Sequence, residues 1–95
     1  MWILRSAEED GSLKFRVPSG AIKTVGRAPR ADFIVDAALV SRVHCRLTAS
    51  GDRLDVDDLS STNGTFVNDQ RVKKGHLKSG DRLRVGRIEL TVEKR

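Results

Sequence analysis

The sequence predicts an all-β domain, an antiparallel sandwich or barrel, and three observations carry that prediction. Apolar and charged residues alternate with a period of two in several segments. Pairs of a turn-forming residue and glycine recur between these segments. No stretch keeps the 3.6-residue apolar period of an amphipathic helix for three turns. Many short strands with frequent turns are typical of an antiparallel sandwich or barrel.

The first half of the chain contributes five expected strands. Residues 1–4, Met-Trp-Ile-Leu, form a short β-rich run, and residues 13–17 alternate as Leu, Lys, Phe, Arg and Val. Residues 22–25 and 33–35 are short runs that contain β-branched or aromatic residues. Residues 45–49 alternate again, as Cys, Arg, Leu, Thr and Ala. Alternation of this kind places one face of a strand in the core and the other in water.

The second half contributes four more expected strands. Residues 54–57, 83–85 and 88–93 alternate between apolar and mostly charged positions, and residues 65–67 are a short β-rich run. Before them, residues 37–40 are expected to form one helical turn at most. The turn signals between strands are Asp10-Gly11, Ser19-Gly20, Ser50-Gly51, Asn63-Gly64 and Ser79-Gly80.

Length and composition exclude several classes of protein. A chain of 95 residues allows one domain, expected to span residues 1–95 and to be compatible with a piece of a larger protein. No apolar run approaches the ~20 residues of a membrane-spanning helix, and the apolar start at 1–4 is too short for a signal peptide. The single Cys45 excludes an internal disulfide framework and fits a reducing compartment. The chain contains one cysteine and two histidines, His44 and His76, which are too few ligands for a structural zinc site. No metal or cofactor is therefore expected.

The net charge of +5 favours anionic partners, which include nucleic acid, phosphorylated protein and acidic lipid. The basic residues form no tail or block, so the net charge is explained by charged residues scattered over a solvated surface and does not by itself require an anionic partner. The densest basic segment contains Arg71, Lys73, Lys74 and Lys78 and is expected to be a solvated loop. Single-strand binders combine such charge with aromatic stacking platforms, and the three Phe residues lie in strand patterns that suggest the core. Direct nucleic-acid binding, small-molecule substrates and membrane binding are therefore not expected.

Polar residues gather between the expected strands. Gly26-Arg27 follows one strand, Ser41-Arg42-Val43-His44 precedes another, and Ser60-Ser61-Thr62-Asn63-Gly64 joins two more. If these three loops meet at one end of a sandwich, they form a cluster of hydrogen-bond donors with little negative charge. Arginine binds phosphate through two parallel hydrogen bonds, and hydroxyl groups add single ones. The loops therefore predict a phosphate-binding site.

These loop residues resemble the forkhead-associated (FHA) domain family. Gly26-Arg27, Ser41-Arg42-Val43-His44 and Asn63-Gly64-Thr65 match the family signature in order and spacing. Runs similar to those of the family also occur at residues 32–35, 58–68 and 77–81. The resemblance covers nearly the whole chain. It implies an antiparallel β-sandwich of about eleven short strands that binds phosphothreonine peptides through loops at one end.

The resemblance also implies residue roles. Arg27 would contact phosphate oxygens, Ser41 would donate its hydroxyl to phosphate, and Arg42 would add a second positive contact. Thr62 matches a position that often helps to hold the phosphate, and Asn63 would bond to the peptide backbone.

Three further positions are expected to support the binding loops rather than to touch the peptide. His44 resembles a structural histidine that ties these loops together. Gly26 belongs to the same signature, and Gly64 allows a backbone turn that a side chain could obstruct.

A narrower resemblance links the Met-Trp start, the run 58–68 and the run 77–81 to the N-terminal FHA domain of nibrin-like DNA-repair proteins. It implies an intracellular, nuclear protein in DNA damage signalling and double-strand-break repair. Its partners would be phosphothreonine proteins with acidic flanking residues. The alternatives are an FHA domain of another phospho-signalling protein, or a docking domain that no longer recognises phosphate.

An enzyme is the rival class, because Ser41 and His44 stand three residues apart. No Gly-x-Ser-x-Gly elbow is present, and no particular aspartate suggests itself as the third member of a triad. No glycine loop of the Walker type precedes a Lys-Ser or Lys-Thr pair. The sequence therefore predicts a binding module with no catalytic residues.

Overall fold

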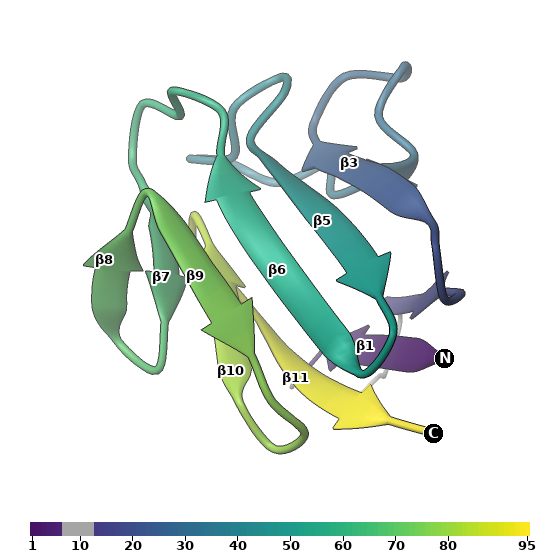
Figure 1. The fold of residues 1–95 in the computed structure, drawn as a ribbon. Coiled ribbons are helices and arrows are strands. Elements are labelled where there is room, and N and C mark those ends of the chain that lie inside the picture. Colours follow the sequence, from purple (N-terminus) through teal and green to yellow (C-terminus); the bar gives the residue numbers. More distant parts are fainter. Residues whose placement is uncertain (7–12) are drawn as a thin grey trace.

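Two β-sheets face each other across a hydrophobic core in the computed structural model, which describes residues 1–6 and 13–95 (Figure 1). Within these residues there are eleven strands and no helix, so none that could cross a membrane. The predicted antiparallel β-sandwich of about eleven strands is thereby confirmed.

The first sheet has six antiparallel strands in the order β2-β1-β11-β10-β7-β8. Its strands are β1 (Trp2–Ser6), β2 (Lys14–Val17), β7 (Thr65–Val67), β8 (Gln70–Val72), β10 (Arg82–Val85) and β11 (Ile88–Lys94). Because β1 pairs with β11 along its whole length, from Trp2 opposite Lys94 to Ser6 opposite Leu90, the two ends of the chain lie side by side.

The second sheet has five strands in the order β4-β3-β5-β6-β9. Its strands are β3 (Ile22–Gly26), β4 (Phe33–Ile34), β5 (Cys45–Ser50), β6 (Arg53–Asp58) and β9 (Lys74–Leu77). All its pairs are antiparallel except β3 with β4, which is parallel.

The period-two pattern fills the core as the sequence predicts. In β5, Cys45, Leu47 and Ala49 are buried while the residues between them face outward. Phe15 of β2 and Phe33 of β4 stack with ring centroids 4.5 Å apart. Trp2 is only 3% exposed, so it belongs to the core. Each fully buried large apolar side chain stabilises the fold by about 1.5–3 kcal/mol relative to an exposed one.

The basic segment that contains Arg71, Lys73 and Lys74 was predicted to be a solvated loop, and this prediction was wrong. Residues 70–72 form β8 and residues 74–77 form β9. β8 pairs with β7, and β9 pairs with β6 from Asp57 opposite Lys74 to Leu54 opposite Leu77. Main-chain hydrogen bonds, the buried side chain of Leu77 and the partly buried side chain of Val72 hold this segment, although most of its other side chains are exposed.

Two smaller predictions were wrong. Phe66 is not in the core: it lies on the outer face of its sheet, with the Arg84 guanidinium carbon 4.2 Å from the ring centre. Residues 37–40 form a tight turn and not a helical one, with Val40 N–H bonded to Ala37 O (3.3 Å) and a left-handed φ of 71° at Leu39.

Four of the five predicted glycine turns are confirmed as turns or bends between strands, each with its glycine at positive φ. The fifth, Asp10-Gly11, lies outside the described residues.

Candidate functional site

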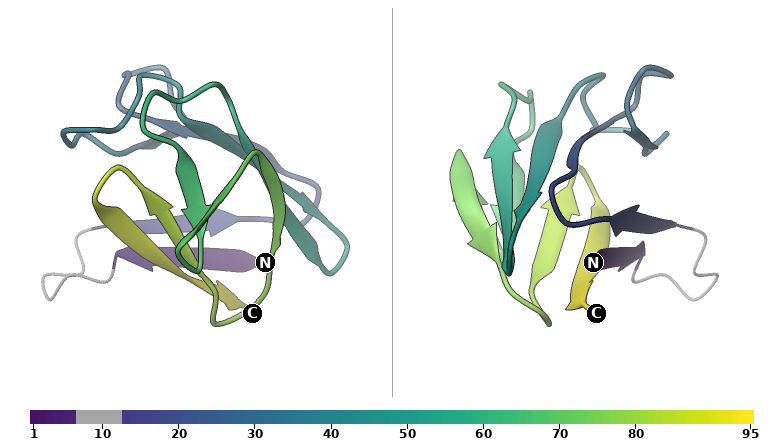
Figure 2. Two further views of the ribbon diagram at one scale, coloured as in Figure 1. Left: turned by 90° about the vertical axis from the view of Figure 1, so that its left-hand side faces the viewer. Right: turned by 45° about the vertical axis from the view of Figure 1, so that its right-hand side comes forward.

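The polar loops singled out in the sequence gather at one end of the sandwich. They follow β3, precede β5 and connect β6 to β7, and Figure 2 shows them together at the end away from the chain termini. The turn between β10 and β11 lies beside them, since Gly86 approaches Val40 and the main chain of residues 38 and 39. The strand ends therefore bring together residues that are far apart in the sequence.

Gly26 allows the first two loops to touch. Arg27 N–H donates to Ser41 O (2.9 Å), and Ala28 N–H donates to Arg42 O (3.1 Å). A β-carbon at Gly26 would lie 2.1 Å from the main-chain oxygen of Arg42, a distance no side chain can occupy. The glycine is thus needed for close main-chain approach, which places Arg27 beside Ser41.

His44 joins all three loops from a fully buried position. Its Nδ1 accepts a hydrogen bond from Ser41 N–H (3.0 Å), so its Nε2 carries the proton that bonds to Gly64 O (2.8 Å). Its main-chain N–H donates to Val25 O (2.8 Å), and its carbonyl accepts from Leu59 N–H (2.9 Å). These contacts are what the predicted structural role requires.

Asp58 organises the third loop, a role that the sequence analysis missed. Its carboxylate accepts hydrogen bonds from Ser61 N–H (3.1 Å), Ser61 Oγ (2.5 Å) and Thr65 Oγ1 (2.7 Å), while Ser61 Oγ accepts from Gly64 N–H (2.9 Å). Burial raises the pKa of Asp58, but the bonds from Ser61 and Thr65 outweigh it and leave the pKa below its usual value. The Asp58-Leu59-Ser60-Ser61 sequence could have indicated this role, because an aspartate side chain often accepts a hydrogen bond from a main-chain N–H a few residues further along the chain.

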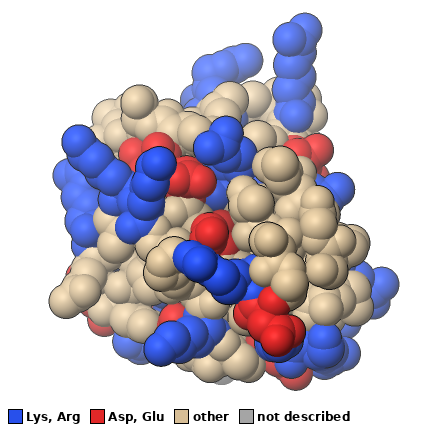
Figure 3. All heavy atoms as spheres, viewed as in Figure 1, with Lys and Arg blue, Asp and Glu red and all other residues tan. Residues whose placement is uncertain are grey.

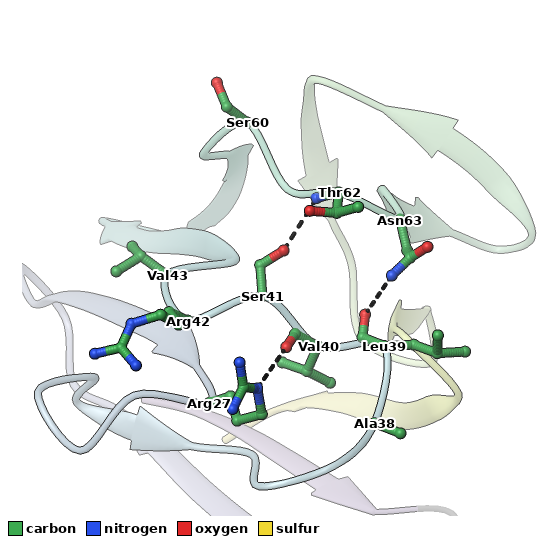
Figure 4. A pocket seen from close by; sticks show the side chains of 10 residues that line it. All are labelled: Arg27, Ala38, Leu39, Val40, Ser41, Arg42, Val43, Ser60, Thr62 and Asn63. Carbon is green, nitrogen blue, oxygen red and sulfur yellow. Dashed lines mark hydrogen bonds between the residues drawn. The ribbon is translucent and has the colours of Figure 1, made fainter.

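The five predicted ligand residues line one open hollow of about 850 Å³ at this end of the molecule, here called the loop-end hollow. Its lining consists of Arg27, Ala38, Leu39, Val40, Ser41, Arg42, Val43, Ser60, Thr62 and Asn63. Figure 4 shows the two arginines on one side of Ser41, with Thr62 and Asn63 on the other.

Hydrogen bonds between the loops hold three of these side chains in place (Figure 4). Thr62 N–H donates to Ser41 Oγ (3.0 Å), Asn63 Nδ2 donates to Leu39 O (3.0 Å), and Arg27 Nε donates to Val40 O (3.2 Å). Each of these side chains still has hydrogen-bond donors that these bonds do not use. Arg27 keeps four N–H groups on its terminal nitrogens, Ser41 keeps its hydroxyl proton, and Asn63 keeps one N–H.

Backbone strain marks the same place. Leu39 (φ 71°) and Ser60 (φ 57°) both adopt the left-handed conformation, which side chains rarely take, and both line the loop-end hollow. Such strain persists only where surrounding contacts impose it. At Leu39 the surrounding contacts include the hydrogen bond that its carbonyl accepts from Asn63.

Other reactive groups lie outside this hollow. Burial raises the pKa of the Cys45 thiol to about 12, so it is not a nucleophile at neutral pH. Among residues 1–6 and 13–95 no group of three His, Cys, Asp or Glu side chains could hold a metal ion.

Comparison with known proteins agrees with this architecture. The model of the FHA domain family matches residues 23–86, which is more than half of the chain. The structure of an FHA domain from a study of phosphothreonine-dependent FHA domain interactions superposes with a TM-score of 0.91 and 31% sequence identity, and covers 99% of this chain and 96% of that one.

Two bacterial relatives show similar identity. The oxoglutarate dehydrogenase inhibitor of Corynebacterium jeikeium is 37% identical over 68% of this chain, and the glycogen accumulation regulator GarA of Mycobacterium tuberculosis is 36% identical over 74% of it. The matched segments span only 45% and 43% of those two proteins. These relatives are regulators, and they give no support to the narrower resemblance to nibrin-like DNA-repair proteins.

Proposed function

Because the chain belongs to the FHA domain family, we propose that it binds phosphothreonine-containing segments of partner proteins and acts as a phosphorylation-dependent signalling module. The observation that carries the proposal is the convergence of Arg27, Ser41, Arg42, Thr62 and Asn63 on one hollow. The similar structure from the study of phosphothreonine-dependent interactions supports it.

The loop-end hollow suits a phosphate group. A phosphorylated threonine carries about −1.5 to −2 charges and three acceptor oxygens. Arg27 offers a planar fork of donors for two of these oxygens, and Ser41 offers a hydroxyl proton. The side chains of Arg42 and Thr62 are exposed at the rim and supply a further charge and a further hydroxyl.

Asn63 suits contact with the peptide backbone. One of its N–H groups is held by Leu39 O, which fixes the plane of the carboxamide. Its oxygen and second N–H then present an acceptor and a donor side by side, as a main-chain amide of a ligand requires. Asn63 therefore positions the segment next to the phosphothreonine.

A binding role is favoured over a catalytic one by the hydrogen bonds of His44. A Ser-His pair needs an imidazole nitrogen directed at the serine hydroxyl. In this protein Nδ1 bonds to the main-chain N–H of Ser41 and Nε2 bonds to Gly64 O, so both nitrogens are occupied by main chain. His44 supports the loops without activating Ser41.

The DNA-repair role is not part of this proposal, because the two bacterial relatives described above are regulators and neither is a DNA-repair protein. The nuclear location depends on the same narrower resemblance and stays a prediction. Docking without phosphate recognition remains the alternative function, and the intact set of Arg27, Ser41 and Asn63 in one hollow argues against it.

Titration of the protein with an oriented library of phosphothreonine peptides tests the proposal. We expect selective capture of phosphorylated members, with loss of capture in an Arg27→Ala variant and full capture in Arg16→Ala, whose exposed side chain lies on β2. Equal capture of the unphosphorylated library would favour the docking alternative.

A further inference from the structure

A second, smaller hollow adjoins the loop-end hollow and has no role so far. This side pocket has a volume of about 330 Å³, and its polar lining comes from Arg46, Asp57, Asp58, Ser60, Lys73 and Lys74. Ser60 lines both hollows, so they adjoin at the β6–β7 loop. Figure 4 shows the Ser60 hydroxyl directed away from Ser41, at the margin of the first hollow.

The acidic side chains of the side pocket already have partners, whereas two of its basic side chains have none among the residues that the structure describes. Arg46 pairs with Asp57 at 3.5 Å, and the Asp58 carboxylate is occupied by Ser61 and Thr65. Within residues 1–6 and 13–95, Lys73 and Lys74 form no ion pair. Figure 3 shows Lys and Arg side chains gathered over the β8–β9 side of the molecule, next to acidic atoms. Two unpaired ammonium groups therefore border a hollow whose own carboxylates are already engaged.

The main chain fixes these two lysines relative to the candidate site. Asp58 N–H donates to Lys73 O (2.8 Å), and Lys74 lies directly opposite Asp57 in the β6–β9 pair. The strand that carries Asp57 and Asp58 continues into the loop that carries Thr62 and Asn63. The main-chain positions from which the two lysine side chains extend are thus fixed beside the candidate site.

We propose that the side pocket accepts a carboxylate side chain of the same segment whose phosphothreonine occupies the loop-end hollow. The proposal rests on the proposed phosphothreonine binding. Because an extended peptide advances about 3.3 Å per residue, a residue within a few positions of the phosphothreonine can pass Ser60 and reach Lys73 and Lys74.

A carboxylate fits the side pocket better than a second phosphate does. Its free cations are lysines, which act as point charges, whereas its arginine is already paired with Asp57. A phosphate would also bring nearly two negative charges close to Asp57 and Asp58, and a carboxylate brings one.

Fluorescence anisotropy with two sets of peptides tests the inference at low salt, where exposed charges are least screened. The first peptide carries phosphothreonine with neutral flanking residues. The others carry a single glutamate, or a single phosphoserine, at each position from five before to five after it. The proteins are wild type, Lys73→Gln/Lys74→Gln, and the charge-matched control Lys14→Gln/Lys78→Gln, whose lysines line neither hollow.

We expect glutamate at one or two positions to tighten binding to wild type by about two- to fivefold, as for exposed ion pairs. This gain should disappear in Lys73→Gln/Lys74→Gln and persist in the control. A gain that persists in both variants, or no gain at any position, would overturn the inference while leaving phosphothreonine binding intact. A much larger gain from phosphoserine than from glutamate at the same position would overturn the assignment to a carboxylate. Failure of the neutral phosphothreonine peptide to bind would instead overturn the proposed function, and the inference with it.

Discussion

Nε2 of His44 lies 2.8 Å from the main-chain oxygen of Gly64, twenty residues further along the chain. The opposite ring nitrogen bonds to Ser41 N–H, so one buried ring spans the two loops that carry Ser41 and Asn63. The position of the side chains that we propose to bind phosphate therefore depends on a residue that does not itself line the loop-end hollow.

We expect His44→Ala to lower both stability and affinity. Removal of the imidazole leaves the Ser41 N–H and the Gly64 carbonyl without their hydrogen-bond partner. This lowers the free energy of unfolding by about 1–3 kcal/mol. For a domain of this size that loss corresponds to a fall in Tm of about 4–24 °C. Thermal unfolding followed by circular dichroism measures the first effect and peptide titration the second. Lost binding with an unchanged Tm would make His44 a direct ligand instead.

Arg27→Ala should weaken phosphopeptide binding by about 10- to 100-fold, because a hydrogen bond to a charged group contributes about 1.5–3 kcal/mol. Arg27→Lys should fall between wild type and Arg27→Ala, since it keeps the charge and loses the planar fork. Calorimetry gives the affinities, and Arg16→Ala is the control for the change in net charge. The assignment is contradicted if Arg27→Ala binds as tightly as the control.

Gly26→Ala should be more damaging than Gly20→Ala. A β-carbon at Gly26 would lie 2.1 Å from Arg42 O, whereas nothing lies within 4 Å of one at Gly20, where only the φ of 83° opposes it. The strain at Gly20 is about 1–3 kcal/mol. Gly26→Ala must in addition separate the two loops. Urea unfolding and peptide titration of both variants check the order, and similar loss in the two would contradict the close approach at Gly26.

Asp58 makes stability depend on pH. The pKa of its carboxyl is lowered in the folded protein, so its contribution is fully present above the unfolded value, about 3.9, and is lost as pH falls through the folded pKa. Wild type should therefore lose stability relative to Asp58→Asn as pH falls below about 4. Urea unfolding between pH 3 and 6 tests this, with Asp36→Asn as a control at an exposed carboxylate. A constant difference across that range would contradict the role of Asp58.

The alternation of side chains was enough to predict an antiparallel sandwich or barrel, and the family resemblance added that the loops meet at one end. Because Val25 lies opposite Cys45 in the antiparallel pair of β3 and β5, the residues that follow Val25 and precede Cys45 emerge at the same end. The signature residues then lie together because the strand ends do.

Other features depend on contacts that a linear pattern does not contain. Thr65 can be buried because its hydroxyl bonds to Asp58, and this turns Phe66 outward against the expectation from hydrophobicity. β9 has little strand propensity of its own and forms because β6 offers it an unpaired edge. The left-handed turn at Leu39 likewise makes a contact that the local sequence does not contain, since its carbonyl accepts a hydrogen bond from Asn63, twenty-four residues away.

Binding of three matched peptides tests the central claim most directly. The peptides share one sequence and differ only in carrying phosphothreonine, phosphoserine or threonine. Fluorescence anisotropy should rank them in that order. Threonine without phosphate leaves the donors of Arg27 and Ser41 without an anion. The methyl group that distinguishes phosphothreonine from phosphoserine contributes about 0.8 kcal/mol when buried, roughly fourfold in affinity, and its branched side chain loses less freedom on binding. Equal affinity for all three peptides would contradict phosphothreonine recognition by this domain.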